Sequence, residues 1–105
     1  MLIPVNKLKN IIIKYLKKQK YTILEENYKC KYGNIDIIAY DNLSKELVFT
    51  KIFPFQNKSK NDINLIAKYY KYLYGIEDIP YRYEILKIGF KKGKYKVIKY
   101  QKLKV

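Results

Sequence analysis

The chain has 105 residues, and 49% of them are hydrophobic, which is enough to bury one sheet-and-helix core but not two. We therefore expect a single domain over residues 1–105. Its 23 basic and 9 acidic residues give a formal charge of +14, and every basic residue except Arg82 is lysine. The lack of histidine excludes a histidine general base or zinc ligand, and the single Cys30 excludes an internal disulfide.

The apolar segments are too short to predict a membrane protein. Lysines interrupt each of them well before the roughly 20 residues that a membrane-spanning helix needs. Residues 1–5 are apolar, but they carry neither a basic leader nor a small-residue cleavage site, so they are not typical of a signal peptide. We expect a soluble, cytoplasmic protein with no membrane partner.

The lysine excess predicts a polyanionic partner, with nucleic acid, and DNA in particular, as the first candidate. Lysines attract phosphates, and each neutralised phosphate releases counterions, so such binding should weaken steeply with salt. Lysine suits phosphate contacts, whereas base reading more often uses bidentate side chains, so sequence-specific recognition is not expected. Alternatively, lysine is only the default surface residue of a chain with biased composition.

The first predicted element is an amphipathic helix over residues 6–19, with Asn6 as its cap. Its apolar face consists of Leu8, Ile12, Tyr15 and Leu16. An alternating pattern rich in β-formers predicts a strand over residues 21–28, and two more strands are predicted over residues 34–40 and 46–53. A turn at residues 29–33 separates the first two strands, and Pro54 ends the third because it has no N–H.

A second helix and a hairpin complete the predicted order. Asn61 is expected to cap the helix, and Gly75 to end it. Its inner stripe consists of Ile63, Ile66, Ala67, Tyr70 and Leu73. Two more strands are predicted over residues 82–90 and 95–100, joined by a turn at residues 91–94. The order αβββαβ(β) describes an α/β sandwich, a mixed central sheet with helices on its faces.

Four blocks of the sequence resemble a known family of small bacterial proteins. They are YTILEENY at residues 21–28, GNIDIIA at 33–39, LVF at 47–49 and RYEI at 82–85. These blocks are similar to the YraN-like family, which belongs to the restriction endonuclease-like, or PD-(D/E)xK, superfamily. The similarity extends to about Ile88 and is most specific over residues 27–39. It implies a restriction endonuclease-like sandwich, related to Holliday junction resolvases.

The resemblance also implies where the catalytic residues would lie, and most of them are replaced. The family's middle strand reads Gly-Glu-Ile-Asp, and the next strand ends in Val-Glu-Val-Lys. Asp36 matches the acid of the first motif, but Lys51 and Phe53 stand at the glutamate and lysine of the second. Lys9 stands where the family tends to carry a glutamate in its first helix.

These replacements predict an impaired catalytic site, in which Asp36 and Lys51 are the remaining catalytic positions. Two carboxylates would hold Mg²⁺ against the scissile phosphate, and a lysine would orient the attacking water. Unit charges about 4 Å apart interact by about 4 kcal/mol at an effective dielectric of about 20, so the Lys51 ammonium would oppose the metal. We therefore expect no metal or other cofactor, and an ion pair between Asp36 and Lys51. Mg²⁺ is a cofactor only if a rearranged site stays active.

Each of these positions has a structural alternative. Asp36 can be a solvated acid at a strand end with no inherited role, and Phe53 can be a core residue. Replacement acids are hard to find, because Glu46 is expected at the other end and on the other face of its strand, and Glu84 matches an acid that can be structural. Lysines that could replace the missing one are Lys58, Lys60 and Lys68.

The expected phosphate contacts lie in two turns and a loop: Lys29, Lys31, Lys58, Lys60, Lys91 and Lys92. Further candidates on the first helix are Lys7, Lys9 and Lys14. The lysine row of residues 91–104 is equally typical of a solvated edge strand. Three functions remain open: a nucleic-acid-binding protein with impaired catalysis, an active Mg²⁺-dependent endonuclease on branched or single-stranded DNA, and a basic module that binds an acidic protein or lipid.

Overall fold

The computed structural model describes the backbone of residues 5–53 and 62–103, and the side chains of residues 7–52 and 62–97. The elements, in chain order, are α1 (Val5–Lys18), β1 (Tyr21–Cys30), β2 (Gly33–Asp41), β3 (Glu46–Phe53), α2 (Ile63–Leu73), β4 (Tyr81–Lys91) and β5 (Lys94–Leu103). This is the predicted order of elements. No helix within these ranges is long and apolar enough to cross a membrane.

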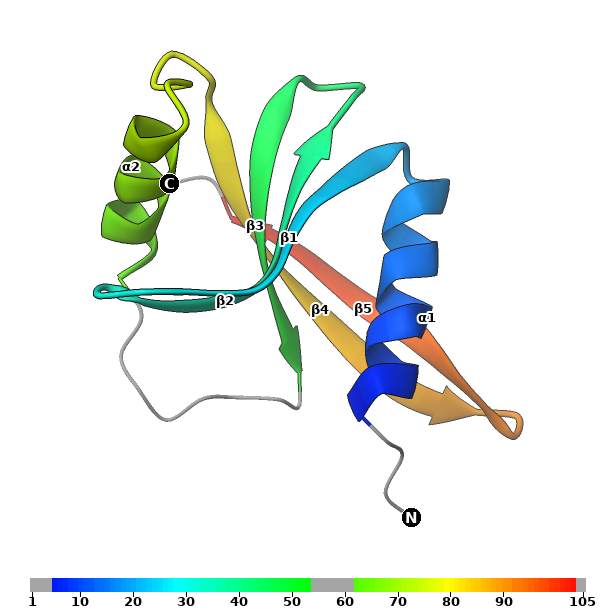
Figure 1. The fold of residues 1–105 in the computed structure, drawn as a ribbon. Helices are drawn as coiled ribbons and strands as arrows, with labels where there is room; N and C mark the ends of the chain where they lie inside the picture. The colour runs from blue at the N-terminus through cyan, green and yellow to red at the C-terminus, as the bar shows by residue number, and fades with distance from the viewer. Residues whose placement is uncertain (1–4, 54–61, 104–105) are drawn as a thin grey trace.

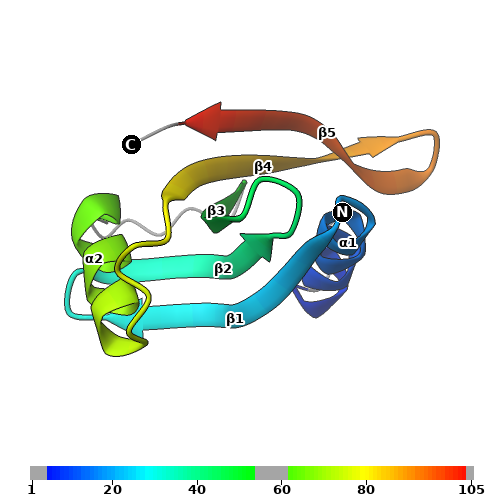
Figure 2. The same ribbon diagram turned by 90° about the horizontal axis from the view of Figure 1, so that it is seen from above.

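The five strands form one mixed sheet in the order β1-β2-β3-β4-β5. Neighbouring strands are antiparallel except β3 and β4, which are parallel. A parallel pair needs a crossover, and α2 lies in the connection between β3 and β4. The two helices lie on opposite sides of the twisted sheet, α2 beside the β1–β2 hairpin and α1 towards β5 (Figures 1 and 2).

The alternation of side chains along the strands divides the apolar core in two. Val48 and Ile52 of β3 pack in one cluster with Ile12 of α1. Phe49, between them, packs in the other cluster with Ile66 of α2. All five side chains are fully buried, and each contributes roughly 1.5–3 kcal/mol of hydrophobic stabilisation. The helices are therefore held by opposite faces of one sheet.

Both predicted helix caps were wrong. α1 begins at Val5, so Asn6 lies inside the first turn. The cap of α2 is Asp62, whose side chain accepts a hydrogen bond from the Leu65 N–H at 3.1 Å. Asn61, the residue predicted for this role, lies outside the described residues. Neighbouring Asn and Asp have nearly equal capping preference, so the sequence alone does not choose between them.

The strands were predicted closely, and β3 spans the expected residues. The other four strands are longer than predicted because the hairpin turns are short: β1 and β2 stay paired to Cys30 and Gly33, and β4 and β5 to Lys91 and Lys94. β5 lies at the edge of the sheet. Lys96, in its first half, is exposed, as expected for a solvated edge strand.

Candidate functional site

Asp36 lies on β2 where the pairing between β2 and β3 ends. The last paired residues are Ile37 and Thr50. One step further, the Asp36 carboxylate Oδ2 accepts a hydrogen bond from the backbone N–H of Ile52 at 2.7 Å. The carboxylate thus accepts from a backbone N–H of β3 just beyond the last paired residues. This bond fixes the position of the half-buried Asp36 side chain.

Lys51 lies beside this carboxylate but does not pair with it. The alternation along β3 places Lys51 in the row of Phe49, as predicted. Its side chain is 7% exposed, and Nζ donates to Asn34 Oδ1 at 3.1 Å. The ion pairs of the described side chains do not include Asp36 with Lys51, so that prediction was wrong. The Asp36 carboxylate instead accepts a hydrogen bond from the Ile52 N–H, and the Lys51 ammonium donates to the neutral side-chain amide of Asn34.

A second buried lysine reaches the same segment from α1. Lys9 is 8% exposed, and its Nζ donates to Asn27 Oδ1 and to the Asp36 backbone carbonyl, the latter at 3.4 Å. Burial lowers the pKa of Lys9, and the carboxylates of Asp36 and Glu26 oppose that shift. Lys9 therefore lies next to Asp36, at the helix position where the resemblance places a glutamate.

The acceptor for Lys9 has an unusual backbone conformation. Asn27 has a φ of +54° inside β1, between the pairs Glu26–Ile37 and Tyr28–Ile35 and hence opposite Asp36. Asparagine tolerates this left-handed region better than most residues, and such positions often mark a functional constraint. Asn27 was not identified from the sequence. A signal was present at Asn34, which stands where the motif of the resembling family has a glutamate and so marks a region with fewer acids.

The donor set of this Asp36 site, which comprises Lys9, Asn27, Asn34, Asp36 and Lys51, does not fit a divalent cation. Mg²⁺ and Ca²⁺ bind oxygen ligands, chiefly carboxylates, and this set supplies one carboxylate with two ammonium groups. Across residues 5–53 and 62–103, no cluster of three or more His, Cys, Asp or Glu side chains could hold a metal. The same set suits an anion, because ammonium groups donate hydrogen bonds to phosphate oxygens.

The remaining candidate acids belong to a separate cluster centred on Arg82. This side chain is 2% exposed and forms three ion pairs at 2.8 Å, with Asp41, Glu46 and Glu84. Burial alone would raise the pKa of Asp41, but hydrogen bonds from Arg82 and from nearby backbone N–H groups lower it to about 2. Glu46 and Glu84 are therefore committed to Arg82 and are no substitutes for the missing metal ligands.

The predicted phosphate-binding lysines do not form one surface. Lys29 and Lys31 are exposed near the β1–β2 turn, whereas Lys91 and Lys92 are exposed near the β4–β5 turn. Figures 1 and 2 show these turns at opposite ends of the molecule. Lys58 and Lys60 lie outside the described residues, and so does the side chain of Phe53, whose predicted packing stays a prediction.

Comparison with known proteins assigns the chain to a family. The sequence profile of the uncharacterised protein family UPF0102 matches residues 10–64, and a UPF0102 protein of Thermotoga neapolitana is 37% identical over 84 residues, 70% of this chain and 76% of the relative. The chain belongs to the UPF0102 family. UPF0102 proteins of Thermotoga petrophila and Thermotoga maritima are 54% identical over 39 residues, 37% of this chain and 34% of each relative. These two matches thus span about a third of the relatives' length.

Proposed function

We propose that this UPF0102 protein binds nucleic acid through phosphates on a restriction endonuclease-like fold that has lost metal-dependent cleavage. The observation that carries the proposal is that two buried lysines bond to neighbouring residues of β2, Lys9 to the Asp36 carbonyl and Lys51 to the Asn34 side chain. Both lysines stand where the resemblance to the PD-(D/E)xK superfamily places carboxylates. The element order and the mixed sheet, with one helix on each face, support the same scaffold.

The chemistry of the Asp36 site supports binding without cleavage. In an active relative the metal would offset the charge of the phosphate and activate water. Here two buried ammonium groups supply positive charge directly, and the residues offer no second carboxylate to hold a metal. Lys51 has three N–H groups and Asn34 takes one of them, so the side chain keeps donors for a phosphate oxygen.

The proposal is tested by binding and cleavage assays on the same substrates. Fluorescence anisotropy with duplex, branched and single-stranded DNA, and with RNA, should show an affinity that falls linearly with salt on a log–log plot. The variant Lys9→Gln/Lys51→Gln should show a shallower salt dependence. A matched control, Lys45→Gln/Lys87→Gln, removes the same charge from exposed positions in the β2–β3 turn and on β4.

Cleavage is tested by incubating wild-type protein with these substrates and Mg²⁺ or Mn²⁺. Intact substrates are expected. Cleavage that disappears in Asp36→Asn, which keeps an acceptor for the Ile52 N–H, would instead establish a rearranged nuclease site. A wild-type protein that binds none of these substrates even at low salt would refute the binding function and favour a partner of another class.

A further inference from the structure

A groove of about 510 Å³ lies between α1 and β5, away from Asp36. Its lysines are Lys14, Lys17 and Lys18 of α1 and Lys96 of β5. All four are exposed, and the described residues that line the groove include no acid. Its volume lies within the range of roughly 300–1,000 Å³ that small ligands occupy in proteins. The opening of this α1–β5 groove is therefore strongly positive.

The floor of the α1–β5 groove is apolar and aromatic. Ile11, Tyr15, Tyr95 and Val97 line it and are half-buried. Tyr15 and Val97 also pack against the core cluster beneath α1, so this part of the groove is held in place. The ring of Tyr95 lies 4.9 Å from that of Phe90, centre to centre, and Phe90 is 57% exposed. The groove thus joins a charged opening to an aromatic surface.

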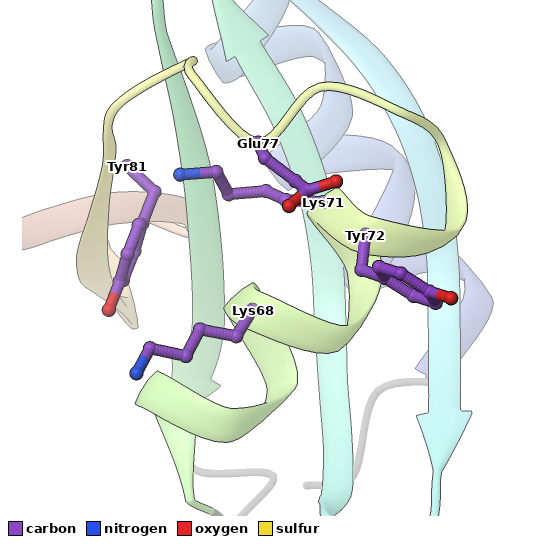
Figure 3. Close-up of a pocket in the computed structure, with 5 residues that line it drawn as sticks. All are labelled: Lys68, Lys71, Tyr72, Glu77 and Tyr81. Carbon is purple, nitrogen blue, oxygen red and sulfur yellow. The ribbon is translucent and has the colours of Figure 1, made fainter.

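A second cavity also has lysines beside tyrosines, but its lining is less positive. This cavity of about 420 Å³ lies between α2 and the start of β4, and Figure 3 shows the residues that line it. They are Lys68, Lys71, Tyr72, Glu77 and Tyr81. It has half as many lysines as the α1–β5 groove, and the Glu77 carboxylate offsets part of their charge. Charge complementarity therefore favours the α1–β5 groove.

We propose that the α1–β5 groove binds an unpaired nucleotide of a single-stranded nucleic acid, with its base against Tyr95 and its phosphates at the four lysines. Lysines bind phosphate as point charges, and aromatic side chains stack on any base, so the groove recognises a single strand without reading its sequence. An acidic peptide would use the lysines but would not need the aromatic side chains at the floor of the groove.

This inference rests on the proposed function and extends it to a second contact on the same helix. Lys9 and Lys17 are eight residues apart on α1, which is about 12 Å along the helix axis. A nucleic-acid strand rises about 3.4 Å per stacked nucleotide, so a few nucleotides span that distance. The axial distance between the Asp36 site and the α1–β5 groove is therefore within the reach of one strand.

The test uses a short fluorescent oligothymidylate and an abasic strand of the same length. Tyr95→Leu should lower the affinity for oligothymidylate about tenfold, leave its salt dependence unchanged and leave the abasic strand unaffected. Tyr95→Phe should retain the affinity. Lys17→Gln/Lys96→Gln should reduce the salt slope by about 1.4, because single strands release about 0.7 counterions per phosphate. The control Lys45→Gln/Lys87→Gln should leave the slope nearly unchanged.

The outcomes separate this inference from the proposed function. If wild-type protein binds nucleic acid and Lys9→Gln/Lys51→Gln weakens that binding while the groove variants bind normally, the groove inference fails and the function stands. If Tyr95→Leu lowers the affinity for oligothymidylate and for the abasic oligonucleotide equally, contact between Tyr95 and a nucleobase is also refuted. Loss of binding to anionic vesicles alone in Lys17→Gln/Lys96→Gln would assign the groove to lipid. Absence of nucleic-acid binding by the wild type would refute both proposals.

Discussion

The Arg82 cluster and the Asp36 site lie on the same sheet, but they are built in opposite ways. In the first, one guanidinium contacts three carboxylates, each at 2.8 Å. In the second, two ammonium groups accompany one carboxylate, and neutral oxygens of Asn27, Asn34 and the backbone accept their hydrogen bonds. The ions of the Arg82 cluster pair with one another, whereas the two lysines of the Asp36 site donate to neutral oxygens.

Replacing Arg82 is expected to have the largest effect on stability. Arg82→Met should lower the free energy of unfolding by roughly 3–5 kcal/mol, because it leaves buried carboxylates without a counter-charge. Urea denaturation followed by circular dichroism measures the loss. Glu46→Gln is the matched control: its carboxylate is 21% exposed, so the cost should be about 1 kcal/mol or less. Equal losses of unfolding free energy in Arg82→Met and Glu46→Gln would contradict the view that the buried carboxylates depend on Arg82.

A pH series tests the same cluster through Asp41. Its pKa in the folded protein is about 2, below the ordinary value of 3.8, so this group stabilises the fold above about pH 4. The stability should fall by about 2 kcal/mol as the pH drops from about 4 towards 2, because protonation removes the bond to Arg82. Urea titrations at several pH values measure the slope. Asp41→Asn should flatten it, and an unchanged slope would contradict the assignment.

Restoring acids should turn the Asp36 site into a metal site. Lys9→Glu/Lys51→Glu places two carboxylates beside Asp36 and removes the two positive charges that oppose a cation. Electron paramagnetic resonance should detect Mn²⁺ binding by this variant, and adding Asp36→Asn should abolish it. A variant that stays unable to bind Mn²⁺ would show that these positions do not converge as described.

The smallest expected effect on stability is that of Lys51→Met. A buried lysine held by a neutral amide can be replaced by an apolar side chain of similar length at a cost of about 1 kcal/mol or less. The salt slope for DNA binding should nevertheless fall by about 1, as expected when one phosphate contact is lost. A loss of stability as large as that of Arg82→Met would assign Lys51 a structural role like that of Arg82.

Local patterns in the sequence predicted the elements and part of the site. The run of β-forming residues ended by Pro54 predicted β3 to the residue, and the resemblance drew attention to Lys9 and Lys51, which bond to neighbouring residues of β2. The acceptors of these lysines were not predictable, because Asn27 reaches its place through a left-handed residue in β1. The α1–β5 groove was missed as well, since Lys17 and Lys96 come together only when the helix packs beside the last hairpin.

The most direct test of the central claim, that two lysines have replaced the metal ligands around Asp36, is a Mn²⁺ titration of the unmodified protein followed by electron paramagnetic resonance. The arrangement of Lys9, Asp36 and Lys51 predicts no saturable site that depends on Asp36. Tight Mn²⁺ binding by the wild type that Asp36→Ala abolishes would contradict it.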